Sequence, residues 1–181
     1  MSSEKKNIDK IQKFKSHNGL LKLWNRIKKK STPKWHSGKA FEYLILRAFE
    51  LEGAEITWPY SVSLFGENVE QIDGAILITQ LGIISLVESK DLKENVNIEP
   101  IAKLRNQLLR RPSGCVGSVF STTGFTEPAI TLAHFVQPQS IILWEKDNIE
   151  FCLKNKNFIN GFIKKYKANH TSGIPNFDLT I

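Results

Sequence analysis

The apolar and polar positions of the chain alternate in short blocks, and the clearest of these blocks spans residues 70–93. Two apolar runs flank a polar turn at residues 79–82. Runs of this length joined by a short turn predict the two strands of a β-hairpin. The hairpin brings Asp73, at the start of its first strand, toward Glu88 and Lys90 at the end of its second. Because side chains alternate along a strand, Glu88 and Lys90 share one face.

Helical periodicity precedes the hairpin. Residues 8–27 repeat apolar positions at helical spacing, interrupted by Gly19, which predicts two short basic amphipathic helices that pack on the domain or on a partner chain. Ser37 is the expected N-cap of a helix that ends at Gly53, because serine caps helices and glycine terminates them. Glu42 lies on this helix at the border of its buried stripe.

The remaining blocks predict further strands and helices. Residues 55–64 form an expected first strand, and Pro59 makes it an edge strand or a bent one. After the hairpin, the pattern predicts a helix over 100–111, an apolar strand over 115–120, a helix capped by Thr126, a strand over 140–144 and a closing basic helix around Phe158, Phe162 and Tyr166. A strand, a helix and a strand of these lengths predict a parallel pair with a right-handed crossover.

Length and composition indicate one globular domain with terminal extensions. The 181 residues are 41% hydrophobic and 10% aromatic, which argues against a disordered chain. Cys115 and Cys152 lie far apart without metal-ligand spacing, so we expect buried thiols in a reducing compartment. No apolar run approaches the roughly 20 residues that span a bilayer, and the first six residues carry no secretory pattern. We therefore expect a cytoplasmic protein with no membrane partner.

The positive charge is concentrated near the N-terminus. Residues 1–39 carry 12 lysines and arginines against 2 acids, whereas the remaining 142 residues carry 13 against 16. Such a segment predicts binding to a polyanion, most commonly nucleic acid; a solubilising tail or a face for an acidic protein remains the alternative. The expected phosphate contacts are Lys28, Lys29 and Lys30 in this segment, and Lys103, Arg105, Arg110 and Arg111 on the 100–111 helix.

The ionisable groups at the hairpin allow two interpretations. Two carboxylates held close together repel each other unless a cation lies between them, and Mg²⁺ prefers oxygen ligands. Asp73 and Glu88 would then bind a metal ion, and Lys90 would polarise a water molecule or stabilise the charge that develops during phosphodiester cleavage. The alternative is that Asp73 is a turn residue, while Glu88 and Lys90 form an exposed ion pair of little energetic value.

The order of these elements and motifs resembles a known family. In chain order, the motifs are Gly38-x-x-Phe41-Glu42, Asp73-Gly74, Glu88-x-Lys90, Thr123-Gly124-Phe125-Thr126-x-x-Ala129-x-x-x-Ala133 and Ile141-Ile142-Leu143-Trp144. Over about residues 37–153 the chain resembles the Mrr-like restriction endonuclease domain of the PD-(D/E)xK nuclease superfamily. The resemblance implies an α/β fold, a restriction-endonuclease-like three-layer α/β/α core with a mixed central sheet. Its order is a helix, a three-strand meander, a helix, a strand, a helix and a strand.

The resemblance also implies an activity and a set of site residues. It implies Mg²⁺-dependent hydrolysis of DNA phosphodiester bonds, with Mn²⁺ able to substitute, in restriction or phage defence. Asp73 and Glu88 are the implied metal ligands, Lys90 the catalytic lysine, and Glu42 an accessory metal or water ligand. The chain keeps only Asp73-Gly74 where Mrr-like domains often show Asp-x-Gly-x-Asp, so Glu70 is an alternate acid. Mrr-like domains often show Gln-x-Lys in the second strand of the hairpin. This chain carries Glu88-x-Lys90 there, which is the commoner form in the superfamily.

Domain boundaries and partners follow from the same interpretation. We expect a basic N-terminal helical arm at 1–36, a nuclease-like core at 37–153, and a basic C-terminal helix and tail at 154–181. DNA is the expected partner. Because one active centre cuts one strand, we expect either a homodimer, formed through the apolar faces of 20–27 or 158–166, or a separate specificity or NTPase subunit. Two other functions remain open, a non-catalytic nucleic-acid-binding or assembly module and a structure-specific repair nuclease or junction resolvase.

Overall fold

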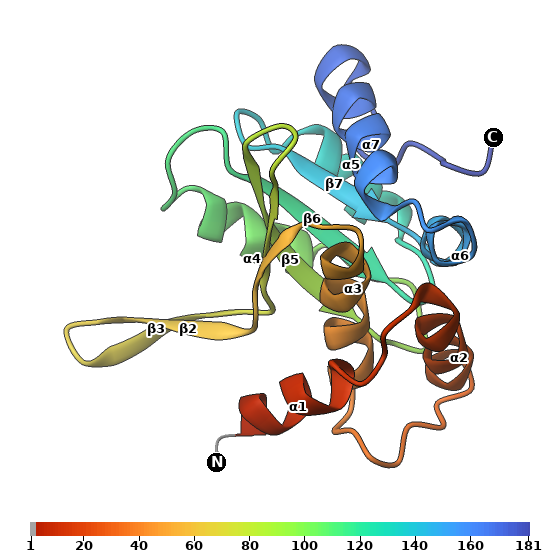
Figure 1. Cartoon of the computed structure of the whole chain (residues 1–181). Helices are drawn as coiled ribbons and strands as arrows, with labels where there is room; N and C mark the ends of the chain where they lie inside the picture. Colours follow the sequence, from red (N-terminus) through yellow and green to blue (C-terminus); the bar gives the residue numbers. More distant parts are fainter. Residues whose placement is uncertain (1–2) are drawn as a thin grey trace.

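A mixed β-sheet lies between two layers of helices in the computed structural model, which describes residues 3–181 (Figure 1). The first two residues of the predicted N-terminal arm lie outside this range. The helices are α1 (Ser3–Ile11), α2 (His17–Lys28), α3 (Lys39–Leu51), α4 (Glu99–Leu108), α5 (Glu127–His134), α6 (Lys146–Asn155) and α7 (Phe158–Ser172). The strands are β1 (Glu55–Thr57), β2 (Tyr60–Leu64), β3 (Glu67–Ile72), β4 (Ala75–Ile78), β5 (Ile83–Lys90), β6 (Val116–Ser121) and β7 (Ile141–Trp144).

The central sheet has the strand order β1-β4-β5-β6-β7. Strands β1, β4 and β5 form an antiparallel meander, and the predicted hairpin is confirmed as β4 and β5. Strands β5, β6 and β7 run parallel, which confirms the parallel pair expected around Thr126. Thr126 caps α5 as predicted, because its side chain accepts a hydrogen bond from the backbone N–H of Ala129.

The two faces of the sheet bury different helices. Side chains of α1, α2, α3, α6 and α7 share one apolar cluster with alternate residues of the strands, such as Val87 and Phe120. Side chains of α4 and α5 form the other cluster with the residues between them, such as Leu86 and Val119. A strand of period two that is buried on both faces produces this division. The predicted three-layer α/β/α core with a mixed sheet is therefore confirmed.

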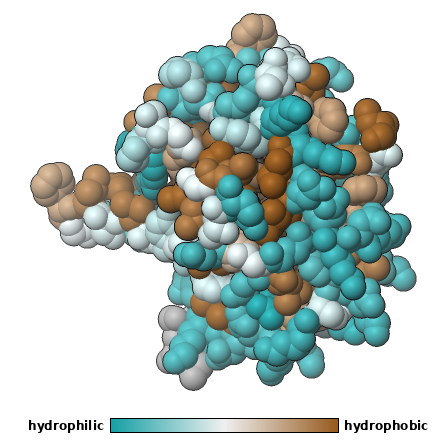
Figure 2. All heavy atoms as spheres, turned by 45° about the horizontal axis from the view of Figure 1, so that its top comes forward, coloured by the Kyte–Doolittle hydropathy of each residue, from teal (hydrophilic) through white to brown (hydrophobic). Residues whose placement is uncertain are grey.

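The strand predicted over 55–64 is divided into β1 and β2, whereas the edge position and the bend expected from Pro59 are confirmed. The chain bends at Trp58 and Pro59, since proline cannot donate to a sheet, and β2 leaves the sheet to pair with β3 alone. The resulting ribbon projects from the domain (Figures 1 and 2). Its exposed apolar residues are Leu64, Phe65 and Val69.

Three further expectations differ from the structure. The break between the N-terminal helices lies at residues 12–16, because Ser16 caps α2 and places Gly19 inside it. Ser37 is not the N-cap of α3; Gly38 holds that position with φ 77°, a left-handed conformation that suits glycine. Helix α6 is absent from the predicted elements, and it crosses residue 154, where the basic tail was expected to begin.

The apolar faces expected to form a dimer interface are buried inside this chain. Leu20, Trp24 and Ile27 of α2 and Phe158 and Phe162 of α7 are at most 1% exposed and belong to the large cluster. These faces are thus not available to a second subunit, which corrects that expectation. The same cluster contains side chains from all three expected segments, 1–36, 37–153 and 154–181. The domain limits at residues 36 and 153 stay predictions. No helix within residues 3–181 is long and apolar enough to cross a bilayer.

Candidate active site

Asp73 lies in the link between β3 and β4, at the edge of the sheet. Its Oδ2 accepts a hydrogen bond of 2.9 Å from the backbone N–H of Ser89, which holds the carboxylate beside the end of β5. Gly74 follows with φ +147°, and a Cβ at this position would lie 2.7 Å from Leu46 Cδ1 and 3.0 Å from the carbonyl oxygen of Thr57. Gly74 is therefore required by the backbone, because only glycine fits this conformation and this space.

Glu88 is the most buried charged group of the site. Its side chain is 1% exposed, and two lysines contact it: Lys90 Nζ lies 2.5 Å from Oε1, and Lys103 Nζ lies 2.7 Å from Oε2. The alternative of an exposed ion pair at the end of the strand is wrong, because the side chain of Glu88 is buried. A buried carboxylate of this kind is retained only where cations or hydrogen bonds compensate its desolvation.

Glu42 projects from α3 and completes a group of three carboxylates. It is 6% exposed, and Lys39 Nζ donates to both of its oxygens at 2.8 and 2.7 Å. Burial raises the pKa of Glu42 to about 7, and the charges of Asp73 and Glu88 add to this rise against the opposing effect of Lys39. The three acids are thus close enough to interact electrostatically, although they come from different elements.

The pKa values of Asp73 and Lys90 are shifted in the same direction. Burial and the charge of Glu88 raise the pKa of Asp73, while the Ser89 N–H and the two lysines oppose this rise. Burial opposes the ammonium form of Lys90, but the neighbouring carboxylates, Glu88 foremost, raise its pKa. The site therefore accumulates negative charge that protons or cations must balance.

The donor set fits a hard divalent cation. Glu88 Oε1 is buried without a hydrogen bond, because the contact with Lys90 is an ion pair and lacks hydrogen-bond geometry. Among residues 3–181, no three side chains of the histidine, cysteine, aspartate and glutamate types form a ready-made metal cluster. Mg²⁺ does not need one, since it commonly binds one or two carboxylates and completes its shell with water and phosphate. Asp73 and Glu88 are suitable carboxylates for such an ion.

The predicted phosphate contacts fall into two groups. Several are engaged with acids: Lys28 contacts Glu150, Lys30 contacts Asp91, Lys103 contacts Glu88, and Arg110 and Arg111 contact Glu70. Lys29 is exposed at the end of α2, and Arg105 is half-buried on α4. Glu70, the alternate acid, is thus joined by two arginines to the turn that follows α4, which ends at Leu108 and not at residue 111 as expected.

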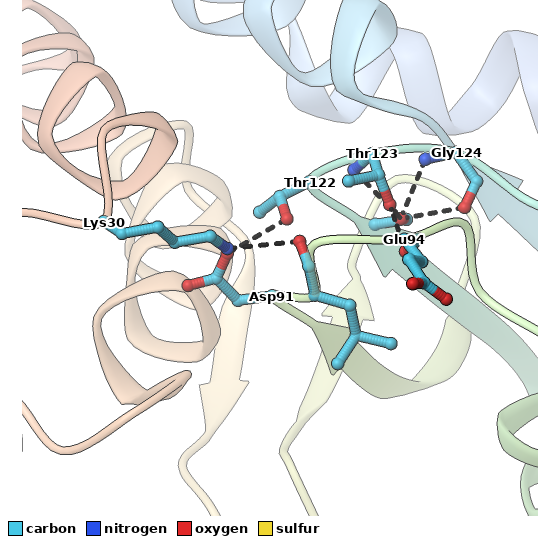
Figure 3. A network of polar contacts seen from close by, with 8 residues as sticks. Lys30, Asp91, Glu94, Thr122, Thr123 and Gly124 are labelled. Atoms are coloured by element: carbon cyan, nitrogen blue, oxygen red, sulfur yellow. Dashed lines mark hydrogen bonds and ion pairs between the residues drawn. The ribbon is translucent and has the colours of Figure 1, made fainter.

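The Lys30–Asp91 contact belongs to a wider network that Figure 3 shows. Asp91 also accepts a hydrogen bond from Thr122 Oγ1 at 3.0 Å, and Lys30 donates to the carbonyl oxygen of Leu92 at 3.2 Å. The network fixes the connection between α2 and α3 over the carboxyl ends of β5 and β6. Asp91 thereby anchors the N-terminal segment.

The sequence of the chain matches the model of a known protein family. Residues 34–152 match the family model of the Mrr catalytic domain, described as a restriction endonuclease. The chain belongs to the Mrr-type restriction endonuclease family. The predicted resemblance over about 37–153 is thereby confirmed. The matched range of this nuclease family contains Glu42, Asp73, Glu88 and Lys90.

The comparisons with individual proteins add little to the family assignment. One solved structure that is similar to the chain is described as the MspJI restriction endonuclease in complex with a 27-mer oligonucleotide, at 16% identity and a TM-score of 0.40. The similarity covers 96% of this chain but 37% of that one, so the chain spans little more than a third of that protein's length. No curated protein sequence matches the chain.

Two lysines beside the carboxylates were not predicted as part of the Mrr-type site. Lys39 contacts Glu42, and the signal for this pair was its spacing of three residues at the start of a helix. Lys103 was expected to face a phosphate, yet it reaches Glu88 across the gap between α4 and β5. Sequence alone carries no signal for that contact, because 15 residues separate the two side chains.

Proposed function

We propose that the chain is a divalent-metal-dependent DNA endonuclease of the restriction type. The observation that carries this proposal is the convergence of three carboxylates, from α3, the β3–β4 link and β5, with Lys90 and Lys103 at one edge of the sheet. Membership of the Mrr-type family supports the same conclusion, since restriction endonucleases generally use divalent ions. Mg²⁺ is the ion we propose, with Mn²⁺ as a substitute.

Each side chain has a distinct role in the proposed reaction. Asp73 and Glu88 would hold the ion, which when bound activates a water molecule and stabilises the leaving oxygen of the phosphodiester. Lys90 stays an ammonium because its pKa is raised, so it stabilises negative charge at the phosphate and does not act as a base. The pKa of Glu42, about 7, suits a group that accepts the proton of the attacking water near neutral pH.

Lys103 would act as a positioning residue in this scheme. Its bond to Oε2 fixes the orientation of Glu88, and its charge lowers the pKa of Asp73 against burial and Glu88. Both effects favour the ionised carboxylates that a metal ion requires. The proposed phosphate contacts are then the cations that lie outside this cluster. We propose that Lys29 and Arg105 bind the DNA backbone. Four further cations would also bind it if a DNA phosphate replaces the acidic residue that each one contacts in the free chain: Lys28, Lys30, Arg110 and Arg111.

The proposal is tested by nicking of supercoiled plasmid. Asp73→Asn and Lys90→Met are expected to lower the cleavage rate at least about 100-fold in Mg²⁺, because each removes a group that acts on the reacting phosphate. Lys93→Met is the matched control, since Lys93 is an exposed lysine on the same segment. Cleavage by Asp73→Asn at the rate of the unmodified chain would refute the mechanism.

The same assay separates the other functions. A chain that binds DNA but cuts no substrate with any divalent ion would be a binding or assembly module. Preference for four-way or flapped DNA over linear duplex would indicate a junction resolvase or repair nuclease. A homodimer, a separate specificity or NTPase subunit, a role in phage defence and a cytoplasmic location stay predictions of this proposal, as do the domain limits.

A further inference from the structure

Some cations of the N-terminal segment form ion pairs with acidic side chains, whereas others do not. Lys28, Lys30 and Lys39 are paired with Glu150, Asp91 and Glu42. Four other cations, Lys10, Lys13, Arg26 and Lys34, line one cavity of about 490 Å³ between α1, α2 and the 31–35 connection. No acidic residue lines this cavity, and within residues 3–181 no ion pair engages any of the four, although Lys10 donates a hydrogen bond of 2.8 Å to the carbonyl oxygen of Lys34. The cavity therefore presents uncompensated positive charge to solvent.

The wall of this cavity is aromatic and apolar. Phe14 and Leu23 contribute from the two N-terminal helices, and Trp35 contributes from the connection. Trp35 is half-buried; Lys10 Nζ lies 5.2 Å from its ring centroid, and the ring centroid of Tyr43 lies 6.0 Å away at an interplanar angle of 43°. Cations beside a fixed aromatic ring suit a nucleotide, because the phosphate meets the cations and the base stacks on the ring.

A second cavity shares part of its lining with the first and includes residues that adjoin the carboxylate site in the sequence, although none of the three carboxylates lines either cavity. This second cavity, of about 470 Å³, shares Ser31, Thr32, Pro33 and Trp35 with the first and extends to Gly38 and Asp91. Gly38 precedes Lys39, which contacts Glu42, and Asp91 follows Lys90. The network in Figure 3 holds this connection in place through Lys30. These residues mark a path that would lead from the carboxylate group, along the connection, into the basic cavity.

We propose that this path binds a single strand of nucleic acid that leaves the carboxylate centre. Lys13, Arg26 and Lys34 contact its phosphates, and an unstacked base lies against Trp35. A single strand is favoured because a cavity of this volume admits unstacked nucleotides and excludes the stacked pairs of a duplex. The inference deepens the proposed function, since it names the strand path of the same site, yet it concerns residues that take no part in the chemistry.

The test measures binding without cleavage. The full chain with Asp73→Asn, in the presence of a chelator, is titrated against a fluorescent single strand of about 15 nucleotides, a length within the range that single-strand-binding sites cover. Lys13→Glu combined with Arg26→Glu is expected to weaken binding at least about 10-fold and to reduce the slope of log affinity against log salt by about 1.4, two contacts at about 0.7 each. Both residues are exposed, so the fold does not depend on them.

The controls separate a specific path from general charge. Lys146→Glu combined with Lys156→Glu changes the net charge equally on exposed positions elsewhere, and it is expected to weaken binding less than about 3-fold. Trp35→Leu is expected to weaken binding without changing the salt slope, because it removes stacking alone.

Three results would overturn the proposal. The first is an equal loss of binding affinity in the two charge-reversal pairs, and the second is tighter binding of duplex than of single strand. The third is an acidic peptide that displaces the strand and binds with the same affinity. The last result would make the cavity a protein-docking site. Failure of the chain to cut DNA would refute the nuclease proposal and leave this measurement intact.

Discussion

The substitution Glu42→Gln tests the electrostatics of the carboxylate group directly. In the folded chain, burial and the charges of Asp73 and Glu88 raise the pKa of Glu42 from 4.5 to about 7, against the effect of Lys39. At about 1.4 kcal/mol for each pH unit, the ionised form of Glu42 costs about 3 kcal/mol of folding stability. Because the side chain is only 8% exposed, screening by solvent removes little of this cost.

The sign of the pH dependence follows from the direction of the shift. The folded pKa lies above the unfolded one, so the cost is absent below about pH 4.5, grows as the pH rises toward 7, and is complete above it. Glutamine keeps the shape of the side chain and carries no charge. Without divalent ions, Glu42→Gln is expected to be more stable than the unmodified chain by about 3 kcal/mol near pH 8.5 and by about 1 kcal/mol near pH 5.

Urea unfolding followed by tryptophan fluorescence, in a chelating buffer at both pH values, measures this difference. Glu55→Gln is the control, because Glu55 is an exposed glutamate on β1. Added Mg²⁺ is expected to narrow the gap at high pH, since it binds the folded, unmodified chain and stabilises it. An equal stability difference at both pH values, or a variant less stable than the unmodified chain near pH 8.5, would refute the reasoning.

Three further substitutions probe the support of the site by urea unfolding. Lys103→Met leaves Glu88 buried with one lysine, and it is expected to lower stability by about 2 kcal/mol and slow cleavage. Gly74→Ala places a Cβ 2.7 Å from Leu46 at φ +147°, so a loss of at least about 3 kcal/mol is expected. Hydrogen bonds from two lysines lower the pKa of Glu150 to about 2; the stabilisation is present above about pH 4.5 and lost as the pH falls toward 2. With solvent screening, Glu150→Gln is expected to cost about 1 kcal/mol at neutral pH.

Each of these expectations has a contrary outcome. Unchanged stability and cleavage in Lys103→Met would mean that Glu88 does not need its second cation. A Gly74→Ala chain with full stability would show that the β3–β4 link relaxes without cost. A loss in Glu150→Gln that persists at pH 2 would assign the effect to the hydrogen bond that Trp24 Nε1 donates to Glu150 and not to the ion pairs.

The sequence by itself determined the parts of this protein that depend on local pattern. The apolar runs around residues 79–82 specified the β4–β5 hairpin, because strands of period two joined by a short turn have few other arrangements. Thr126 specified the start of α5, since a side-chain cap is a local interaction. The order of the motifs specified the family and therefore the three-layer core.

Only the tertiary structure decided which charges meet. Glu88 and Lys103 contact each other because α4 packs on the face of β5 that carries Leu86 and Glu88, a consequence of long-range packing. Long-range packing in the other apolar cluster buried the faces of α2 and α7 that were expected at a dimer interface. The bend at Pro59 directed β2 away from the central sheet, so that it pairs with β3 alone. Hydrophobic and capping patterns act over a few residues and can be read from the chain, whereas the compensation of a buried charge depends on elements that approach only after folding.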